Sequence, residues 1–237
     1  MPGYQPLLPF GPIHNVSLFS SHWLDHRLSL EPEYSELRDE AASVLDTLAE
    51  IWKQQRDRVE RYGNEAGLEH GFIQPVLAAL GWKLKYQAQL RNRKPDYALF
   101  IDDASFDGAL RAGHGTDAFW SFPKLLADAK AWGVNLDRRS GAEREYPPEQ
   151  IEWYLERSHL DFAILTNGRL WRLIPRLLNA DQPRFHTYFE CEVPTILKRG
   201  SRGRRHLSGS ATHLTIFCAS TFSLPPSRSA PPTPGDR

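Results

Sequence analysis

Apolar residues recur through residues 33–62 at the three- and four-residue intervals of an amphipathic helix. The predicted stripe consists of Leu37, Ala41, Val44, Leu48, Ile51 and Trp52, with charged residues between them. Acidic residues are concentrated at the start of this segment and basic residues at its end, which is the polarity that the helix dipole favours. The pattern therefore predicts a long helix from Glu33 that ends near residues 62–64.

A second helical stripe follows in residues 65–81, EAGLEHGFIQPVLAALG. Its apolar positions are Phe72, Ile73, Val76, Leu77 and Leu80. Gly81 is suited to the C-terminal cap of this helix. Pro75 lies inside the segment, so it must either occupy a first helical turn or bend the helix axis.

The remaining pattern consists of short strand-like runs with one further helix. Strands are expected at residues 82–90, 96–101, 125–132 and 185–193, a short helix within 102–124, and a helix at 149–158. DFAILT and RLWRLI flank Asn167-Gly168, a pair that favours a two-residue hairpin turn. Together these elements predict a mixed α/β (α+β) domain, with a central mixed sheet flanked by helices.

Composition divides the 237 residues into three parts. Residues 1–32 are rich in Pro, Ser and His and have no clear period, so we expect an irregular segment. The predicted domain occupies 33–195. Residues 196–237 are rich in Ser, Pro, Gly and Arg with little apolar periodicity, and we expect them to form a disordered basic tail. No apolar run approaches the ~18 residues of a membrane-spanning helix, the start lacks the features of a signal peptide, and the two cysteines suggest no disulfide framework, so we expect a cytoplasmic protein.

The formal net charge of zero hides an asymmetry. Residues 195–237 carry seven Lys or Arg and one acid, a net charge of +6, so the rest of the chain carries −6. An acidic body is not the footprint of a protein that binds nucleic acid through surface charge alone. Metal ions or a partner would have to assist any action on nucleic acid, and the basic tail is a further candidate for that contact.

An aspartate and a lysine interrupt the apolar run LLADAKAW at residues 125–132. On a strand, one face would carry Leu126, Asp128, Lys130 and Trp132, and the other Ala127, Ala129 and Ala131. A charge on a central strand is costly unless something neutralises it. A salt bridge between Asp128 and Lys130 would do so, and a bound metal ion is the functional alternative.

Further polar residues precede and follow this run at positions that fit a single site. Asp96 begins the preceding strand, in KPDYALF, and Glu69 lies at the margin of the second helical stripe. Glu65 is the competing candidate for the helix glutamate, and Glu69 could instead be an ordinary solvated helix residue. Gln150 and Tyr154 are four residues apart on a predicted helix, so they share a face. These two could also serve only to cap and pack that helix.

With these motifs the chain resembles the PD-(D/E)xK nuclease superfamily, in the form found at the N-terminus of type IIG restriction–modification enzymes and in related type I restriction subunits. The resemblance covers roughly residues 33–195 and rests on FIQPVLAALGW, PDYALF, ADAKAW and DFAILTNGRLWRLI. It implies a restriction-endonuclease-like core. Pro95-Asp96 corresponds to the first motif and Asp128-Ala129-Lys130 to the second, with aspartate where these relatives more often carry glutamate.

The resemblance also implies the chemistry of the site, which is Mg²⁺-dependent hydrolysis of DNA phosphodiesters. Asp96, Asp128, the backbone carbonyl of Ala129 and Glu69 would hold Mg²⁺, an ion that prefers oxygen ligands. Lys130 would orient or activate the attacking water and offset phosphate charge. The accessory residues Gln150 and Tyr154, which match a motif of RecB-like members, would position the lysine or the DNA.

The expected partner is double-stranded DNA, with no role at a membrane. No Asn-Pro-Pro-Tyr methyltransferase motif follows residue 195, so the resemblance implies a nuclease module detached or truncated from its methyltransferase part. A separate methyltransferase or specificity protein is a possible partner, and S-adenosylmethionine would be a cofactor only if such a domain were present. Two alternatives stay open: a catalytically idle remnant or DNA-binding accessory module, and a RecB-like repair nuclease.

Overall fold

The computed structural model describes residues 12–20, 22–27, 30, 32–62, 64–139, 146–176 and 186–200. The strands are β1 (Ile13–Val16), β2 (Lys83–Tyr86), β3 (Tyr97–Phe100), β4 (Leu125–Ala129), β5 (Phe162–Thr166), β6 (Leu170–Pro175) and β7 (Tyr188–Glu192). The α-helices are α1 (Pro32–Gln55), α2 (Glu65–Leu68), α3 (Gln74–Ala79), α4 (Asp103–Ala112), α5 (Pro147–Ser158) and α6 (Val193–Gly200). The shorter turns are the π-helical η1 (Trp23–Arg27) and η4 (Glu69–Ile73) and the 3-10 turns η3 (Val59–Arg61) and η5 (Ala118–Ser121).

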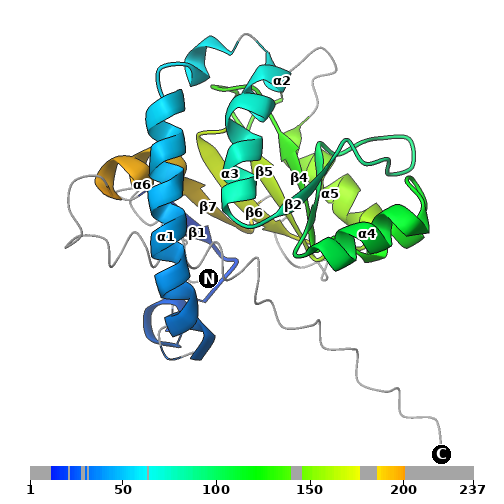
Figure 1. Ribbon diagram of the computed structural model, residues 1–237, viewed down its shortest axis with the longest axis horizontal. Coiled ribbons are helices and arrows are strands. Elements are labelled where there is room, and N and C mark those ends of the chain that lie inside the picture. Colours follow the sequence, from blue (N-terminus) through cyan, green and yellow to red (C-terminus); the bar gives the residue numbers. More distant parts are fainter. Residues whose placement is uncertain are drawn as a thin grey trace, which may run out of the picture.

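All seven strands join one sheet in the order β1-β7-β6-β5-β4-β3-β2 (Figure 1). The pair β4–β5 is parallel, and every other neighbouring pair is antiparallel. Helix α5 connects the two parallel strands, because a parallel pair needs a crossover that returns the chain to the same end of the sheet. The expected class, a mixed α/β fold with a central mixed sheet and flanking helices, is therefore confirmed.

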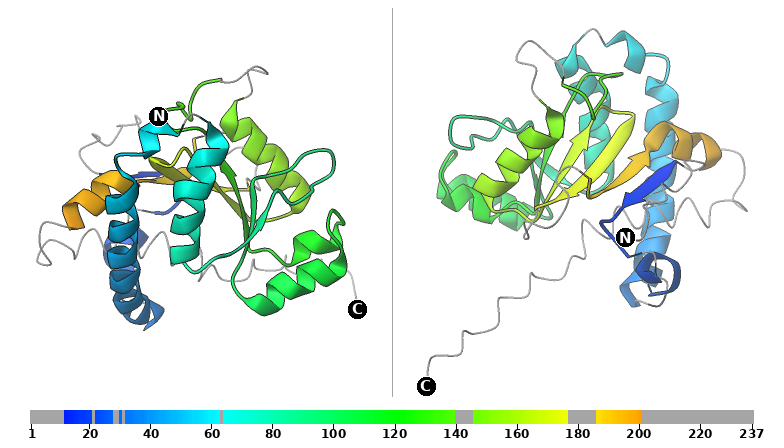
Figure 2. Two further views of the ribbon diagram at one scale, coloured as in Figure 1. Left: turned by 45° about the horizontal axis from the view of Figure 1, so that its top comes forward. Right: turned by 180° about the vertical axis from the view of Figure 1, so that it is seen from behind.

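The helices cover both faces of the sheet, and each face has its own hydrophobic core (Figure 2). Residues of α1 and α3 pack on one face against Ala127 and Ala129, whose small side chains allow a close approach. Residues of α4 and α5 pack on the other face against Leu126. Within β4 the predicted alternation of faces is therefore confirmed.

Trp132 departs from that alternation. Strand β4 ends at Ala129, and Trp132 packs on the α1 side, where its ring stacks on Trp52 at a centroid distance of 6.2 Å. The prediction that Trp132 shares a face with Asp128 is wrong because the chain leaves the sheet before reaching it.

The second predicted helix is present, but it is divided around Pro75. Helix α2 runs directly into the π-helical turn η4 and then into α3, which has Pro75 in its first turn. Proline lacks an amide hydrogen and its ring would collide with the carbonyl four residues earlier, so the wider turn accommodates it without ending the helix. The π-helical turn begins at Glu69, one of the candidate site residues.

The hairpin predicted around Asn167-Gly168 joins β5 to β6. Gly168 has a φ of +80°, a left-handed conformation that favours glycine. The Asn167 side-chain oxygen accepts hydrogen bonds from the backbone amides of Arg169 and Leu170, at 3.0 and 2.8 Å. The side chain thus closes the turn in the manner expected of asparagine.

Folded elements extend beyond both predicted boundaries of the 33–195 region. Strand β1 pairs with β7, so part of the segment expected to be irregular belongs to the sheet. Ile196 and Leu197 of α6 are buried in the core on the α1 side, so residue 196 does not begin a tail. Most of the expected tail, residues 201–237, lies outside the described residues.

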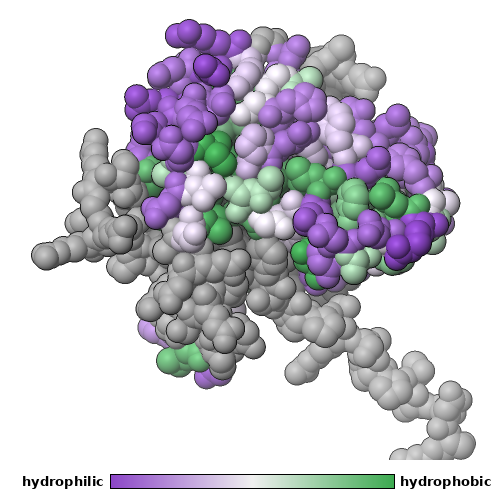
Figure 3. Space-filling model, viewed as in Figure 1, coloured by the Kyte–Doolittle hydropathy of each residue, from purple (hydrophilic) through white to green (hydrophobic). Residues whose placement is uncertain are grey.

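Apolar residues reach the surface around α4, where polar residues surround them (Figure 3). The large exposed side chains of this region are Ile101, Leu110 and Phe122. Within the described part of the chain, no helix is both long and apolar enough to cross a membrane.

Candidate active site

The candidate site lies where β3 begins and β4 ends. Tyr97 pairs with Ala127 in the antiparallel β3–β4 ladder, and one further step of this register places Asp96 beside Asp128. Helix α5 starts near the same end, because it connects β4 to the parallel strand β5. The topology therefore collects residues from two strands and from helices on both faces at one end of the sheet.

Asp96 is fixed by the backbone of the neighbouring strand. The Ala129 amide donates a hydrogen bond to Asp96 Oδ2 at 2.7 Å. Burial, followed by the nearby charge of Asp128, raises the pKa of Asp96 to about 9, although the Ala129 hydrogen bond favours the ionised form. Asp96 therefore holds a proton near neutral pH unless a cation replaces it.

Asp128 is 2% exposed in the centre of the sheet and forms an ion pair with Lys130. Burial disfavours the charged form of Lys130, but the charge and hydrogen bond of Asp128, together with the charges of Glu65 and Asp96, outweigh that cost and the pKa of Lys130 is raised. The ammonium group is therefore charged at neutral pH. The backbone amide of Lys130 also donates to the Thr166 carbonyl at 2.7 Å, which holds the residue at the end of β4.

Two glutamates reach the site from the helical segment formed by α2 and η4. Glu65 and Glu69 are four residues apart across α2 and η4, so they point to one side of this helical segment. Three carboxylate oxygens, one each from Glu65, Glu69 and Asp96, lie within 4.8 Å of one another. Burial raises the pKa of Glu65 to about 6 and also raises that of Glu69.

Tyr97 holds Glu69 in this position. Its hydroxyl donates a hydrogen bond to Glu69 Oε2 at 2.9 Å within the buried core. Burial and the charge of Glu69 together raise the pKa of Tyr97, so the hydroxyl remains a donor throughout the ordinary pH range. Glu69 itself is only 4% exposed, which excludes the solvated role considered for it.

Gln150 and Tyr154 come from α5 on the other face. The Gln150 amide donates to the Tyr154 hydroxyl at 3.0 Å, and this hydroxyl donates to the Lys94 carbonyl at 3.3 Å. Burial, then the charges of Asp128 and Asp96, raise the pKa of Tyr154. The pair thus links α5 to the segment that leads into Asp96.

The structure places at one end of the sheet the predicted side chains, which are Glu69, Asp96, Asp128, Lys130, Gln150 and Tyr154. The three acids whose oxygens lie within 4.8 Å of one another are Glu65, Glu69 and Asp96, so Asp128, which was predicted as a metal ligand, is outside that cluster. The structure places both competing glutamates in the cluster, so Glu65 joins Glu69 instead of replacing it. Ala129 reaches Asp96 through its amide group, and the role predicted for its carbonyl stays a prediction. Tyr97 was missed, although a hydroxyl in the apolar run DYALF signals a buried polar partner.

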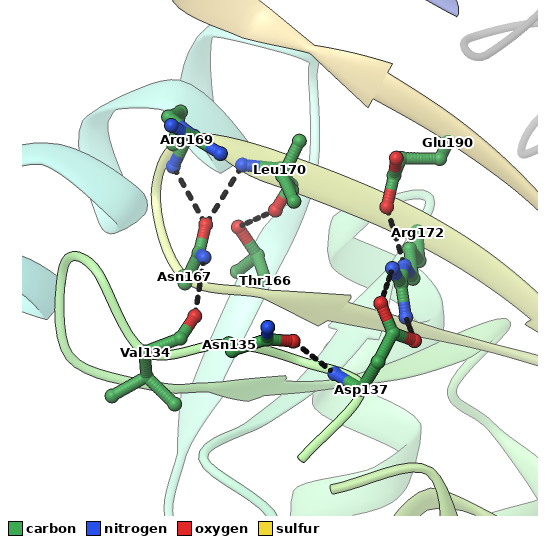
Figure 4. A network of polar contacts seen from close by, with 9 residues as sticks. All are labelled: Val134, Asn135, Asp137, Thr166, Asn167, Arg169, Leu170, Arg172 and Glu190. Atoms are coloured by element: carbon green, nitrogen blue, oxygen red, sulfur yellow. Dashed lines mark hydrogen bonds and ion pairs between the residues drawn. The ribbon is translucent and has the colours of Figure 1, made fainter. Parts of the chain in front are cut away.

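A second polar network, centred on the buried residues Arg172 and Asn167, supports the segment that follows Lys130 (Figure 4). Arg172 of β6 donates two hydrogen bonds to Asp137, at 2.6 and 2.8 Å, and also pairs with Glu190 of β7. The Asn167 amide donates to the Val134 carbonyl at 2.8 Å. Sequence reasoning missed this network, although Arg172 interrupts the apolar run RLWRLI much as Asp128 interrupts its own.

A small pocket of about 50 Å³ lies elsewhere, between α5 and strands β6 and β7. Its polar lining includes Glu152, Glu156, Arg172 and Arg176, and neither the three clustered acids nor Asp128 contribute to it. It is therefore separate from the candidate active site.

Comparison of the chain with protein-family models, with curated proteins and with solved structures gives no significant match.

Proposed function

We propose that the chain is a Mg²⁺-dependent DNA endonuclease with a restriction-endonuclease-like core, acting in the cytoplasm as the nuclease module of a type IIG-like restriction–modification system. The observation that carries the proposal is the cluster of Glu65, Glu69 and Asp96. Asp128 lies beside Asp96 on the neighbouring strand and is paired with a charged Lys130. The order of elements β3, β4, α5 and β5 accounts for that arrangement.

The donor set fits a hard divalent cation. Glu65, Glu69, Asp96 and Asp128 offer only carboxylate oxygens, which Mg²⁺ prefers over nitrogen or sulfur. Burial is the main cause of the raised pKa values of Glu65 and Asp96, and the charges of neighbouring acids raise them further. A cation bound there would displace the protons that otherwise neutralise these carboxylates. Bound Mg²⁺ supplies Lewis-acid stabilisation of a phosphate and a more acidic bound water.

The residues of the chain have separate roles in this proposal. Asp96 and Asp128 orient their carboxylates from adjacent strands. Lys130, because it keeps its proton, would hold the attacking water by a hydrogen bond and offset charge that develops on the phosphate, instead of acting as a general base. Tyr154 and Gln150 keep the Asp96 segment in place through the Lys94 carbonyl.

The Asp128–Lys130 ion pair favours one competing function. It neutralises both buried charges without a metal, as a catalytically idle remnant or DNA-binding accessory module would require. This alternative predicts that the acids are structural and that Mg²⁺ has no specific site among them.

Removal of the two strand acids separates these functions. We expect the wild type to bind Mg²⁺ in a calorimetric titration and to nick supercoiled plasmid in Mg²⁺ but not in EDTA. The double variant Asp96→Asn, Asp128→Asn should lose both properties. The control double variant Asp46→Asn, Asp57→Asn removes two exposed acids of the α1 region and should retain them. Mg²⁺ binding that survives loss of Asp96 and Asp128 would refute the site.

A further inference from the structure

Two of the three clustered acids each have one carboxylate oxygen engaged by a buried donor. Glu69 Oε2 accepts a hydrogen bond of 2.9 Å from the Tyr97 hydroxyl. Asp96 Oδ2 accepts one of 2.7 Å from the Ala129 amide. Tyr97 and Ala129 are fully buried in the neighbouring strands β3 and β4. Each of these two acids therefore has one oxygen committed to the sheet, and a cation would meet the other oxygen.

Tyr97 is fixed in the position from which it contacts Glu69. Its backbone pairs with Tyr86 of β2 on one side and with Ala127 of β4 on the other. Its ring lies 5.7 Å from the Tyr86 ring, measured between the ring centroids. Because Tyr97 is buried, no water can replace Glu69 as the acceptor of its hydroxyl, and loss of that acceptor would be costly.

Tyr86 is a second tyrosine close to Glu69, but its surroundings differ. Burial raises the pKa of Glu69, and hydrogen bonds from Tyr97 and, to a smaller extent, from Tyr86 oppose that rise. Tyr86 is half-exposed on β2, the last strand of the sheet, so water can take its place when a cation binds. Tyr97 is therefore the lasting partner of this carboxylate.

Mg²⁺ and Ca²⁺ use a carboxylate differently. Ca²⁺ takes about six to eight oxygen ligands and readily accepts both oxygens of one carboxylate. Mg²⁺ is smaller, demands nearly octahedral geometry and keeps several of its waters. A carboxylate that is limited to one oxygen therefore suits Mg²⁺ better than Ca²⁺.

We propose that Tyr97 is a positioning residue that raises the preference of the acidic cluster for Mg²⁺ over Ca²⁺, because it keeps Glu69 Oε2 away from the cation. The inference rests on the proposed function and adds to it the selectivity of the metal site. The Ala129 amide restricts Asp96 in the same way, but it belongs to the backbone. Tyr97 is the donor that a substitution can remove.

The affinities for the two cations test this role. Calorimetric titrations of the metal-free protein with Mg²⁺ and with Ca²⁺, each alone, would give the ratio of the two affinities. Tyr97→Phe should weaken Mg²⁺ binding by about 10–100-fold, as is typical for loss of a hydrogen bond to a metal ligand. Ca²⁺ binding should weaken less, because Ca²⁺ can use both oxygens of the released carboxylate. The ratio of Mg²⁺ to Ca²⁺ affinity should therefore fall by about tenfold.

A matched control distinguishes this role from a general loosening of the fold. Tyr188→Phe also removes one phenolic hydroxyl, from a half-buried residue of β7 whose ring packs against Arg172, and should leave both affinities unchanged. A purely structural effect of Tyr97→Phe would weaken the binding of both cations equally. An unchanged ratio in Tyr97→Phe, or an equal fall of the ratio in Tyr188→Phe, would overturn the proposal.

A second comparison covers a Tyr97→Phe protein that does not fold because Glu69 Oε2 has lost its buried donor. The side chain of Glu69→Gln is neutral and offers a single oxygen, so neither cation can gain a second oxygen from it. Tyr97→Phe added to Glu69→Gln should therefore cause no further change in the ratio of affinities, since Tyr97 acts through Glu69. A further fall of the ratio would contradict the proposal.

Plasmid nicking in Mg²⁺ separates the failure of this inference from that of the proposed function. A wild type that binds neither cation would overturn both. A ratio that falls in Tyr97→Phe, without any nicking by the wild type, would support the role of Tyr97 and contradict the nuclease. Nicking by the wild type with an unchanged ratio in Tyr97→Phe would contradict the role of Tyr97 alone.

Discussion

Asp96 shows most clearly how the environment changes the chemistry of a single residue. An aspartate in an unfolded chain has a pKa near 3.9, whereas burial and the charge of Asp128 raise the pKa of Asp96 to about 9. Between these two values the folded protein holds a proton that the unfolded chain has lost. Asp96 consequently favours the folded state at low pH, and that contribution is lost as the pH rises.

The effect of pH on the metal-free protein follows from this shift. We expect the melting temperature of the wild type in EDTA to fall between about pH 5 and about pH 9, because the unfolded state binds fewer protons throughout that range. The substituted side chain of Asp96→Asn cannot titrate, so the melting temperature of this variant should fall less than that of the wild type over the same pH range. Differential scanning fluorimetry at several pH values would measure both, and parallel profiles would show that Asp96 ionises normally.

Residue types and order were sufficient to predict most side chains of the site. Asp96, Asp128 and Lys130 are conspicuous because they are charges next to or within apolar strands, where a bare charge is costly. Tyr97 was not predicted, since its hydroxyl depends on Glu69, which is distant in sequence. The choice between Glu65 and Glu69 was also undetermined, because helix periodicity does not show which turn faces the sheet.

At the scale of elements, the segment after β4 depends on strands far away in the sequence. Arg172 of β6 is 3% exposed and binds Asp137 in that segment and Glu190 of β7. Its hydrogen bonds to Asp137 lower the pKa of that carboxyl group. Arg172 therefore joins the chain that follows Lys130 to the centre of the sheet.

Replacement of Arg172 should destabilise the protein more than a surface change would. Arg172→Met leaves the buried Glu190 without its partner, and loss of one member of a buried pair costs about 3–5 kcal/mol. The double variant Arg172→Met, Glu190→Met should lose less stability than Arg172→Met, because it leaves no unpaired charge of this pair in the core. Urea unfolding of the two variants measures the difference in the free energy of unfolding, and equal losses would show that the pair is not coupled.

Element boundaries were the least predictable feature of the fold. Strand β1 has only four residues and no alternation of polar and apolar positions, so its pairing with β7 has no local signal. Pro194 suggested the end of the domain, yet it is the second residue of α6, where a missing amide hydrogen does no harm. The long periodic helices and the β5–β6 hairpin were predictable because their signals are local.

For the whole molecule, one end of the sheet concentrates the chemistry. The β3–β4 register places Asp96 beside Asp128, the parallel β4–β5 pair brings α5 to the same end, and α2 and η4 add two glutamates from the other face. The sequence predicted this class of fold from the order of helices and strands. It could not predict the full strand order, because distant pairings depend on contacts that no local pattern records.

In the proposed nuclease, Lys130 acts on the reaction and is not only a partner of Asp128. The most direct measurement is the rate of plasmid nicking by wild type and Lys130→Ala in Mg²⁺, with the melting temperature of both proteins measured in Mg²⁺ and in EDTA. We expect the variant to nick plasmid about 10²–10³-fold more slowly than the wild type, as is typical for loss of one electrostatic stabiliser. In EDTA the variant should also have a lower melting temperature than the wild type, because Asp128 loses its partner. Mg²⁺ should restore part of the lost melting temperature. A wild type that nicks plasmid no faster than Lys130→Ala would contradict a role of Lys130 in the reaction.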